Sequence, residues 1–165
     1  MLAGPTGVGK STIVNVAAGS KIIFEPDYET CEWKAIATPE LFPIGHRESC
    51  TFEPKFWKNQ KTNIVYADCP GLNDSRGILH EILKSFFLKE LAKTARSLKI
   101  LLVCDLPCLK AERMGVFGIF LEQIQFLFPK LSLINETRLI VTKCSSMFNA
   151  KGIVNKMRGK LDYKE

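Results

Sequence analysis

A run of glycines near the start of the chain ends in a lysine and a serine, and these residue types at this spacing suit phosphate binding. The run matches the pattern G-x-x-x-x-G-K-[ST] at every fixed position: Gly4-Pro5-Thr6-Gly7-Val8-Gly9-Lys10-Ser11. Glycine lets the backbone take positive φ and turn consecutive N–H groups towards one anion. We expect Lys10 to reach the β- and γ-phosphates of a nucleoside triphosphate, and the Ser11 hydroxyl to bind Mg²⁺.

Such a loop must open a helix, because the N–H groups and the dipole of the helix N-terminus complete the anion site. The segment Thr12–Ala18 supplies that helix, and Gly19 is a suitable stop. Thr12 therefore joins the predicted phosphate-binding residues. A chance glycine-rich turn is the alternative interpretation, and a second motif argues against it.

The second motif is an acidic residue that follows a predicted strand. The segment Thr62–Ala67 is rich in β-branched and aromatic residues and leads into Asp68-Cys69-Pro70-Gly71. A carboxylate at the end of a strand beside a phosphate loop is suited to hold Mg²⁺, directly or through water. Gly71 would offer a bare backbone N–H to the γ-phosphate. Asp68 and Gly71 are thus predicted metal-binding and nucleotide-binding residues.

Together the two motifs resemble the first and third motifs of GTPases of the translation-factor and Ras-like class. The sequence around them is most similar to septins and the immunity-associated GIMAP group, which carry a run much like Asp68 to Ser75. It also resembles G-domain proteins of ciliates. The resemblance covers residues 1 to about 145. It implies one G-domain with a three-layer α/β P-loop fold, a mostly parallel sheet with one antiparallel hairpin strand, and GTP or GDP with Mg²⁺ as ligands.

The resemblance also implies roles for three further residues. A threonine before the hairpin binds Mg²⁺ and the γ-phosphate in this class, and Thr51 is the candidate, with Ser49 as a rival and a plain strand cap as the alternative. Thr142 and Lys143 stand where the class has [NT]-K-x-D, whose Lys packs over the purine. Ser145 replaces the Asp and cannot supply a charged acceptor to guanine, which weakens the expected preference for GTP.

The expected reaction is attack of water on the γ-phosphate, helped by Lys10 and the loop amides. Leu72 stands where Ras-like enzymes place a Gln that orients the water, so we expect slow hydrolysis or activation in a dimer. Arg113 lies roughly where the GIMAP group keeps a catalytic arginine. Arg76 and His46 are other candidates, and each of the three is more often a surface residue.

Periodicity predicts the remaining elements. We expect a strand around Thr30–Ala37, a hairpin whose first strand follows Thr51, and an amphipathic helix from Ile78 to about Ser97. Further along, the pattern indicates, in order, a buried strand, a largely apolar helix, another strand and a final amphipathic helix: Leu98–Asp105, Glu112–Phe128, Arg138–Lys143 and about 153–161. The 112–128 helix either lies in the core or offers a homodimer face.

Both ends are shorter than the family pattern. Met1-Leu2-Ala3 supplies half of an ordinary strand of about 5–6 residues, and the family's last strand and helix are missing. We therefore expect a sheet with a short central strand, truncated at both ends, and marginal stability.

Length, charge and cysteine content restrict the class of protein. The chain has 165 residues, a net charge of +6 from scattered lysines, and six cysteines without a C-x-x-C pair. These values predict one globular domain in a reducing, cytoplasmic setting, with no zinc site, no specific nucleic-acid partner and no transmembrane segment.

Two other functions remain open. The wording Gly-Pro-Thr-Gly-Val-Gly-Lys also occurs in unfolding ATPases of the AAA class, although these need a strand ending in Asp-Glu. A non-hydrolysing nucleotide-binding remnant used for protein interaction, through the nucleotide face or the 112–128 helix, is the third interpretation.

Overall fold

The computed structural model describes residues 1–29, 31–45, 51–71, 77–110, 115–129 and 137–144. Within these ranges the chain is an α/β protein. Its strands are β1 Leu2–Ala3, β2 Lys21–Asp27, β3 Glu32–Thr38, β4 Lys55–Lys58, β5 Val65–Asp68, β6 Ile100–Asp105 and β7 Thr137–Thr142. Its helices are α1 Lys10–Ala17, α2 Ile78–Thr94, α3 Leu106–Lys110 and α4 Gly115–Leu127.

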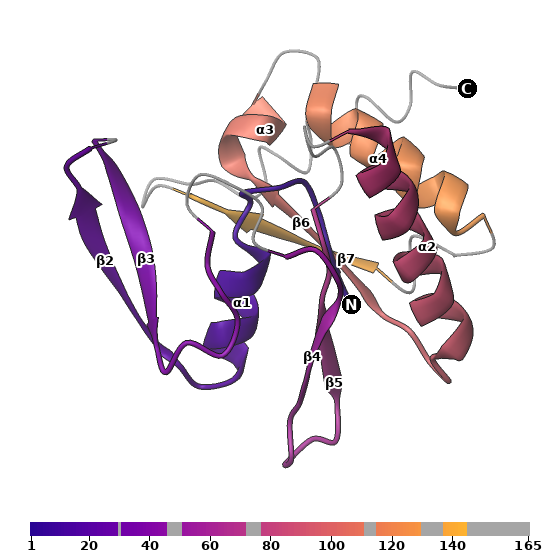
Figure 1. Cartoon of the computed structure of the whole chain (residues 1–165), viewed down its shortest axis with the longest axis horizontal. Helices are drawn as coiled ribbons and strands as arrows, with labels where there is room; N and C mark the ends of the chain where they lie inside the picture. Colours follow the sequence, from indigo (N-terminus) through magenta and orange to yellow (C-terminus); the bar gives the residue numbers. More distant parts are fainter. Residues whose placement is uncertain (30, 46–50, 72–76, 111–114, 130–136, 145–165) are drawn as a thin grey trace.

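Five strands form the main sheet in the order β4-β5-β1-β6-β7 (Figure 1). The two-residue strand β1 lies in the centre and pairs in parallel with both β5 and β6. Strand β7 continues the parallel part beyond β6, whereas β4 pairs antiparallel with β5. The sheet is therefore mostly parallel, and the loops that leave the carboxyl ends of its parallel strands share one edge.

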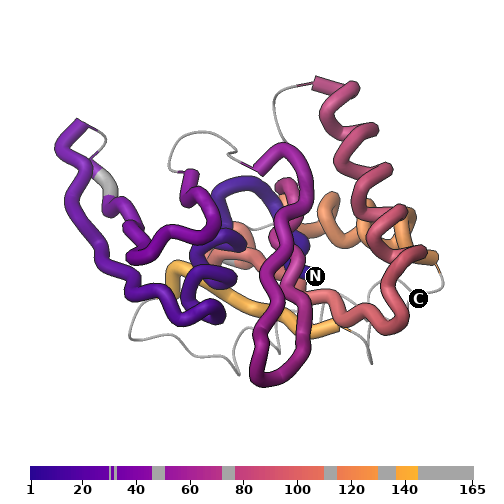
Figure 2. Tube along the Cα trace, turned by 60° about the horizontal axis from the view of Figure 1, so that its bottom comes forward, coloured from indigo at the N-terminus to yellow at the C-terminus, as the bar shows by residue number. Residues whose placement is uncertain are grey.

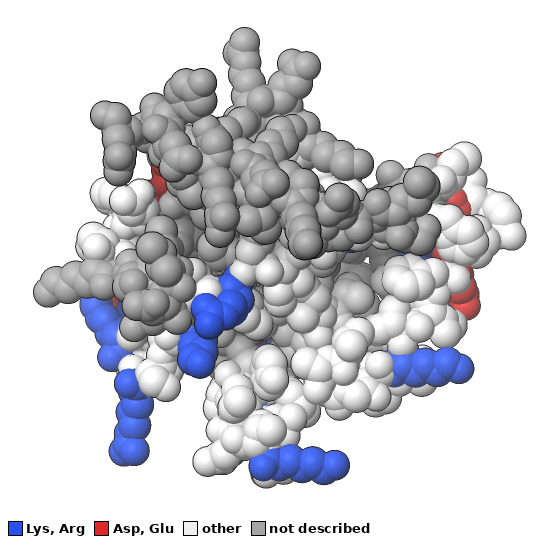
Figure 3. Space-filling view, turned by 180° about the vertical axis from the view of Figure 1, so that it is seen from behind, with Lys and Arg blue, Asp and Glu red and all other residues white. Residues whose placement is uncertain are grey.

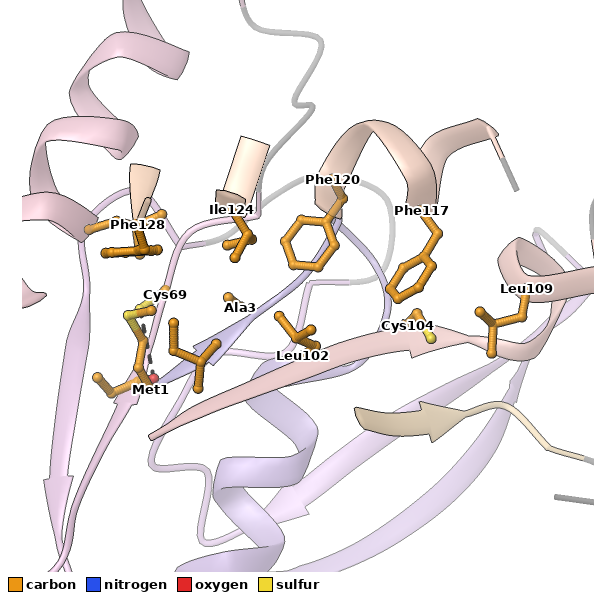
Figure 4. Close-up of a cluster of buried hydrophobic side chains, with 13 residues drawn as sticks. Met1, Ala3, Cys69, Leu102, Cys104, Leu109, Phe117, Phe120, Ile124 and Phe128 are labelled. Carbon is orange, nitrogen blue, oxygen red and sulfur yellow. Dashed lines mark hydrogen bonds between the residues drawn. The ribbon is translucent and has the colours of Figure 1, made fainter. Parts of the chain in front are cut away.

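One face of the sheet packs against α4 and α2. In Figure 4, α4 lies along the sheet and directs Phe117, Phe120 and Ile124 towards Leu102 and Cys104 of β6. All five are fully or almost fully buried. Because side chains alternate along a strand, every second residue of β6 faces this layer. Burial of several large apolar side chains, each worth about 1.5–3 kcal/mol, stabilises the layer.

The opposite face packs against α1. A second buried cluster contains Leu2, Val8, Val14, Phe42 and Val103. Leu2 and Val103 each follow or precede a strand residue that faces α4, so they point to the opposite face. Helices thus cover both faces of the sheet, which explains why the β6 segment is apolar almost throughout.

Strands β2 and β3 form a separate two-stranded antiparallel hairpin beside α1 (Figures 1 and 2). Among the described residues these strands pair only with each other. Isolated hairpins of this kind are at best marginally stable in water, so packing beside α1 has to support this one.

Most of the predicted elements are confirmed. The first helix, the strand ending at Asp68, the β4–β5 hairpin, the strand β6 and the strand β7 lie within a few residues of the predicted bounds. The predicted strand around Thr30–Ala37 is β3, whereas β2 and the short helix α3 were not predicted. The expected helix at about 153–161 lies outside the described residues.

The apolar spacing predicts an amphipathic α2, and only part of that apolar face is buried. Ile78, Leu79, Ile82, Leu83 and Phe86 are exposed, whereas Phe87 is half-buried and Leu91 packs against the core. The fully buried residues of α2 are instead Lys84 and Leu88. The helix turns this face inward because Leu88 packs in the core with α4, while the Lys84 ammonium bonds to the carbonyl oxygen of Gly71.

Candidate functional site

The predicted site residues gather at the carboxyl edge of the parallel strands. The glycine-rich loop follows β1, Asp68 ends β5, Asp105 ends β6, and Thr142 ends β7. Strand β1 has β5 on one side and β6 on the other, so the loop leaves the sheet where the connections diverge. Ligands of open α/β sheets bind at such points.

Close packing requires glycine at two places in this region. A Cβ atom on Gly4 would lie 2.1 Å from the carbonyl oxygen of Val103, and one on Gly71 would lie 2.3 Å from Thr6 Oγ1 and 2.8 Å from Thr6 N. The loop therefore packs directly on β6, and the Asp68–Gly71 segment packs directly on the loop. Gly9 precedes α1 with φ of 91°, a conformation that other residues rarely adopt.

The Lys10 side chain folds back over the loop. Its Nζ donates to the carbonyl oxygens of Gly4 at 3.0 Å and Pro5 at 2.7 Å, and the residue is only 7% exposed. Burial lowers the pKa of Lys10 to about 8, although the carboxylate of Asp68 opposes the shift and the Lys84 ammonium adds to it. The loop thus holds a desolvated ammonium group that lacks an anionic partner in direct contact among the described residues.

The lowered pKa predicts that phosphate binding is coupled to proton uptake. A bound phosphate favours the charged form of Lys10, so above pH 8 binding has to return a proton to Nζ. We expect phosphate affinity to fall by up to about tenfold per pH unit between about pH 8 and pH 10. The neighbouring thiol of Cys69 has its pKa raised by burial to about 12 and does not titrate in this window.

Titration calorimetry at about pH 8.5 in two buffers of different ionisation enthalpy measures this uptake. The apparent binding enthalpy should differ between the buffers at that pH. At about pH 7, where Lys10 is already protonated, Lys10 should take up no proton on phosphate binding. Equal proton uptake at about pH 7 and at about pH 8.5 would exclude Lys10 as the group that takes up the proton.

Ser11, Asp68 and Thr51 form a cluster of oxygen atoms beside Lys10. Ser11 Oγ donates to Asp68 Oδ2 at 2.7 Å, and the Thr51 side chain also hydrogen-bonds to Asp68. Burial raises the pKa of Asp68, against the opposing effects of Ser11 and Lys10. Asp68 Oδ1 is buried and has no hydrogen-bond partner within the described residues.

This donor set fits Mg²⁺. A carboxylate with one unsatisfied oxygen, next to two hydroxyl groups, offers the hard oxygen ligands that Mg²⁺ prefers, and phosphate oxygens and water complete such sites. Within the described part of the chain, no group of three or more His, Cys, Asp or Glu could hold a metal ion. At this site a divalent ion would rely on the mixed set of Ser11, Thr51 and Asp68.

Thr142 and Lys143 lie on the far side of the loop from Asp68. Thr142 Oγ1 donates to the carbonyl oxygens of Val8 at 2.7 Å and Cys104 at 3.2 Å, which ties β7 to the loop. Lys143 Nζ pairs with Asp105 Oδ2 at 3.2 Å. Burial alone would raise the pKa of Asp105, but hydrogen bonds from Cys108 and Lys143 outweigh it and lower the pKa.

One cavity of about 630 Å³ joins most of these residues. Its wall includes the loop from Thr6 to Thr12, with Thr51 and Gly71 from two other connections and Thr142 and Lys143 from β7. A volume of this size is typical of pockets that take cofactors and other small ligands. Gly4, Pro5 and Asp68 do not line the cavity, and Asp68 lies just beneath it, against Ser11.

Two polar residues of the site were not predicted. Lys84 is fully buried on α2, and its Nζ donates to the Gly71 carbonyl oxygen at 3.0 Å and to Glu81 Oε1 at 3.3 Å. Asn15 is fully buried on α1. Lys84 interrupts the apolar stretch from Ile82 to Phe87, which is a weak indication in the sequence that it has a special role. Nothing in the sequence singles out Asn15.

Asn15 fastens α1 to the segment that leads into the cavity wall at Pro43. Its Oδ1 accepts from Leu41 N and Phe42 N, and its Nδ2 donates to Ser11 O and Phe42 O, all between 2.8 and 3.2 Å. Replacement of Asn15 by Ala leaves buried backbone groups unsatisfied. We expect a loss of about 2–3 kcal/mol in the free energy of unfolding, measured by urea denaturation.

A matched control is Asn59→Ala. Asn59 Oδ1 also accepts two backbone N–H bonds, from Lys61 and Thr62, but in an exposed turn where water replaces them. We expect a loss below about 1 kcal/mol there. Equal losses for the two variants would show that Asn15 acts as an ordinary turn residue.

The other candidates fall outside the described residues. These are His46, Ser49, Leu72, Arg76, Arg113 and Ser145, so the expectations about the water-orienting residue, the arginine and guanine discrimination stay predictions.

Comparison with protein-family models, curated proteins and solved structures found no match for this chain.

The described surface bears on the predicted partners. No helix among the described residues is long and apolar enough to span a membrane. Figure 3 shows Lys and Arg side chains at separate positions on one face. Helix α4 buries Phe117, Phe120 and Ile124, while Ile119 and Phe126 are exposed, so it both closes the core and leaves apolar side chains at the surface.

Proposed function

We propose that this chain is a P-loop GTP-binding protein that takes GTP or GDP with Mg²⁺ and hydrolyses GTP slowly or as a dimer, acting as a switch or assembly module. The observation that carries the proposal is the buried Lys10 ammonium, folded over its own loop beside the Ser11–Asp68 pair. Groups suited to bind an anion and groups suited to hold Mg²⁺ lie together there at one edge of the sheet.

The chain's own groups have distinct parts in this proposal. The loop N–H groups and Lys10 bind the phosphates, and Ser11, Thr51 and Asp68 hold Mg²⁺, which supplies charge neutralisation at the phosphoryl oxygens. The Gly71 N–H is suited to contact the γ-phosphate. Hydrolysis is expected to be slow because Thr51 and Gly71, which line the cavity there, carry no basic side chain for the attacking water.

The test is calorimetric titration of the folded chain with GTP, GDP and ATP in the presence of Mg²⁺, followed by phosphate release over hours. Binding of GTP that requires Mg²⁺, with slow release, would support the proposal. A folded chain that binds no nucleotide would refute it.

A second candidate is a nucleotide-binding module without turnover. The burial of Asp68, which lies beneath the cavity and not in its wall, favours it. Full GTP binding with no phosphate release by either the monomer or a concentrated sample would select this candidate over the switch.

A further inference from the structure

The cavity does not end at the phosphate loop. It continues along one side of α1, past Thr12, Ile13 and Val16, to a wall formed by Phe24, Trp33 and Ala35 of the β2–β3 hairpin. Ser11 and Val16 are separated by about 7.5 Å along the helix axis. The far part of the cavity therefore lies beyond the reach of the phosphate-binding groups and is lined mainly by apolar side chains.

The register of the hairpin explains how its three residues share one wall. Phe24 pairs with Ala35, and Trp33 pairs with Pro26, two residues from Phe24. Side chains two residues apart lie on the same face of a strand, so Phe24, Ala35 and Trp33 form one face. The small side chain of Ala35 leaves a recess beside two aromatic rings.

Both rings are open to the cavity. Phe24 is 63% exposed and Trp33 is 69% exposed. Their hairpin pairs with no other described strand. An aromatic platform that ends a phosphate-binding cavity is suited to stack a planar ring. We propose that the hairpin face Phe24–Ala35–Trp33 binds the base of the nucleotide by stacking.

This inference rests on the proposed function and specifies how it takes the base. Stacking uses the π-face that every base has, so it discriminates little between adenine and guanine. The subsite therefore takes nucleoside triphosphates as a class, GTP and ATP alike. Ser145, which lacks the charge needed to read guanine, is consistent with a base held in this way.

The first experiment uses Trp33 as its own reporter. The chain has two tryptophans, so Trp57→Phe leaves Trp33 as the single emitter. Mg²⁺ complexes of GTP, ATP and inorganic tripolyphosphate are titrated, with binding measured in parallel by calorimetry. We expect both nucleotides to change Trp33 emission, with affinities within about threefold of each other, because stacking tolerates either base. Tripolyphosphate should bind without changing the emission.

Variants of the hairpin provide the second measurement. Phe24→Leu, which keeps the apolar bulk but removes the ring, should weaken binding of both nucleotides by about 5- to 100-fold and leave tripolyphosphate affinity unchanged. Phe24→Tyr should restore nucleotide affinity. Tyr28→Ala is the matched control, because Tyr28 belongs to the same hairpin and is 89% exposed but does not line the cavity.

The outcomes separate the two proposals. If a nucleotide binds but Trp33 emission stays constant, or if Phe24→Leu weakens tripolyphosphate as much as nucleotide, the stacking subsite is wrong and the proposed function stands. If GTP binds far more tightly than ATP, the class assignment is overturned. If no nucleotide binds to the folded chain, the proposed function and the subsite fail together.

Discussion

Replacement of Lys10 by Ala should abolish measurable nucleotide binding. Lys10 Nζ is buried and held over the loop by the carbonyl oxygens of Gly4 and Pro5, so its charge stands where phosphate would enter. Charge-assisted hydrogen bonds contribute about 1.5–3 kcal/mol each, and contacts with two phosphates would be lost. The expected loss of affinity is at least about 100-fold in calorimetric titration with Mg²⁺ and GTP.

Two further variants show whether this loss is specific. Lys10→Met fills the space of the buried stem and should lose binding as severely while it keeps the circular dichroism spectrum. Lys61→Ala removes a lysine from the exposed turn between β4 and β5 and should bind like the parent chain. Affinity that survives in both Lys10 variants would show that the loop is not the phosphate site.

Replacement of Asp68 by Asn should have opposite effects on stability and on magnesium dependence. Burial raises the pKa of Asp68, so the native state binds its proton more tightly than the unfolded chain does. The contribution of Asp68 to stability is complete below the unfolded pKa and is lost as pH rises through the raised native pKa. At pH 7 without Mg²⁺, the Asn variant should therefore unfold at a higher temperature than the parent.

The same substitution should remove the advantage that Mg²⁺ gives to triphosphate binding. Loss of a ligand or of its supporting carboxylate typically costs 10- to 100-fold in metal affinity, roughly the loss expected here. The measurement is GTP titration with Mg²⁺ and with excess chelator. The parent should lose affinity on chelation, and the Asn variant should bind weakly in both conditions.

Asp105→Asn is a control of opposite sign for the stability effect. Its pKa is lowered, because hydrogen bonds from Cys108 and Lys143 outweigh burial. Its stabilising contribution is present above the unfolded pKa and is lost as pH falls through the native value, so this variant should melt lower at pH 7. A higher melting temperature for both variants would show that removal of any negative charge stabilises this chain.

The position of the candidate site was predictable where local sequence determines the turn. The glycines of the loop, Lys10 and Ser11 carry their geometry within eight residues, and Asp68 is marked by the end of a strand. Parallel pairing then brings these ends together at one edge of the sheet. Thr142 ends the predicted strand of β-branched and apolar residues, whereas its nucleotide-binding role comes from the resemblance and stays a prediction.

Interactions between distant segments were not predictable in this way. Asn15 and Lys84 are polar residues inside helices, and nothing local shows that one bonds to Phe42 and the other to Gly71. Apolar spacing identified α2 as a helix but not its buried face. Strand β2 was missed because most of its residues are exposed or half-buried and Pro26 interrupts it, so neither alternation nor a continuous apolar run marks it.

The bond from Lys84 to Gly71 makes α2 a lever arm. The Lys84 ammonium is buried. If its bond to the Gly71 carbonyl breaks, the charge must either move out to water or stay buried without a partner, and both are costly. A displacement of Gly71 must therefore pull the first half of α2 with it. About 15 Å of helix separates Lys84 from Thr94, so a tilt of about 5° becomes a displacement of an ångström or more at Thr94.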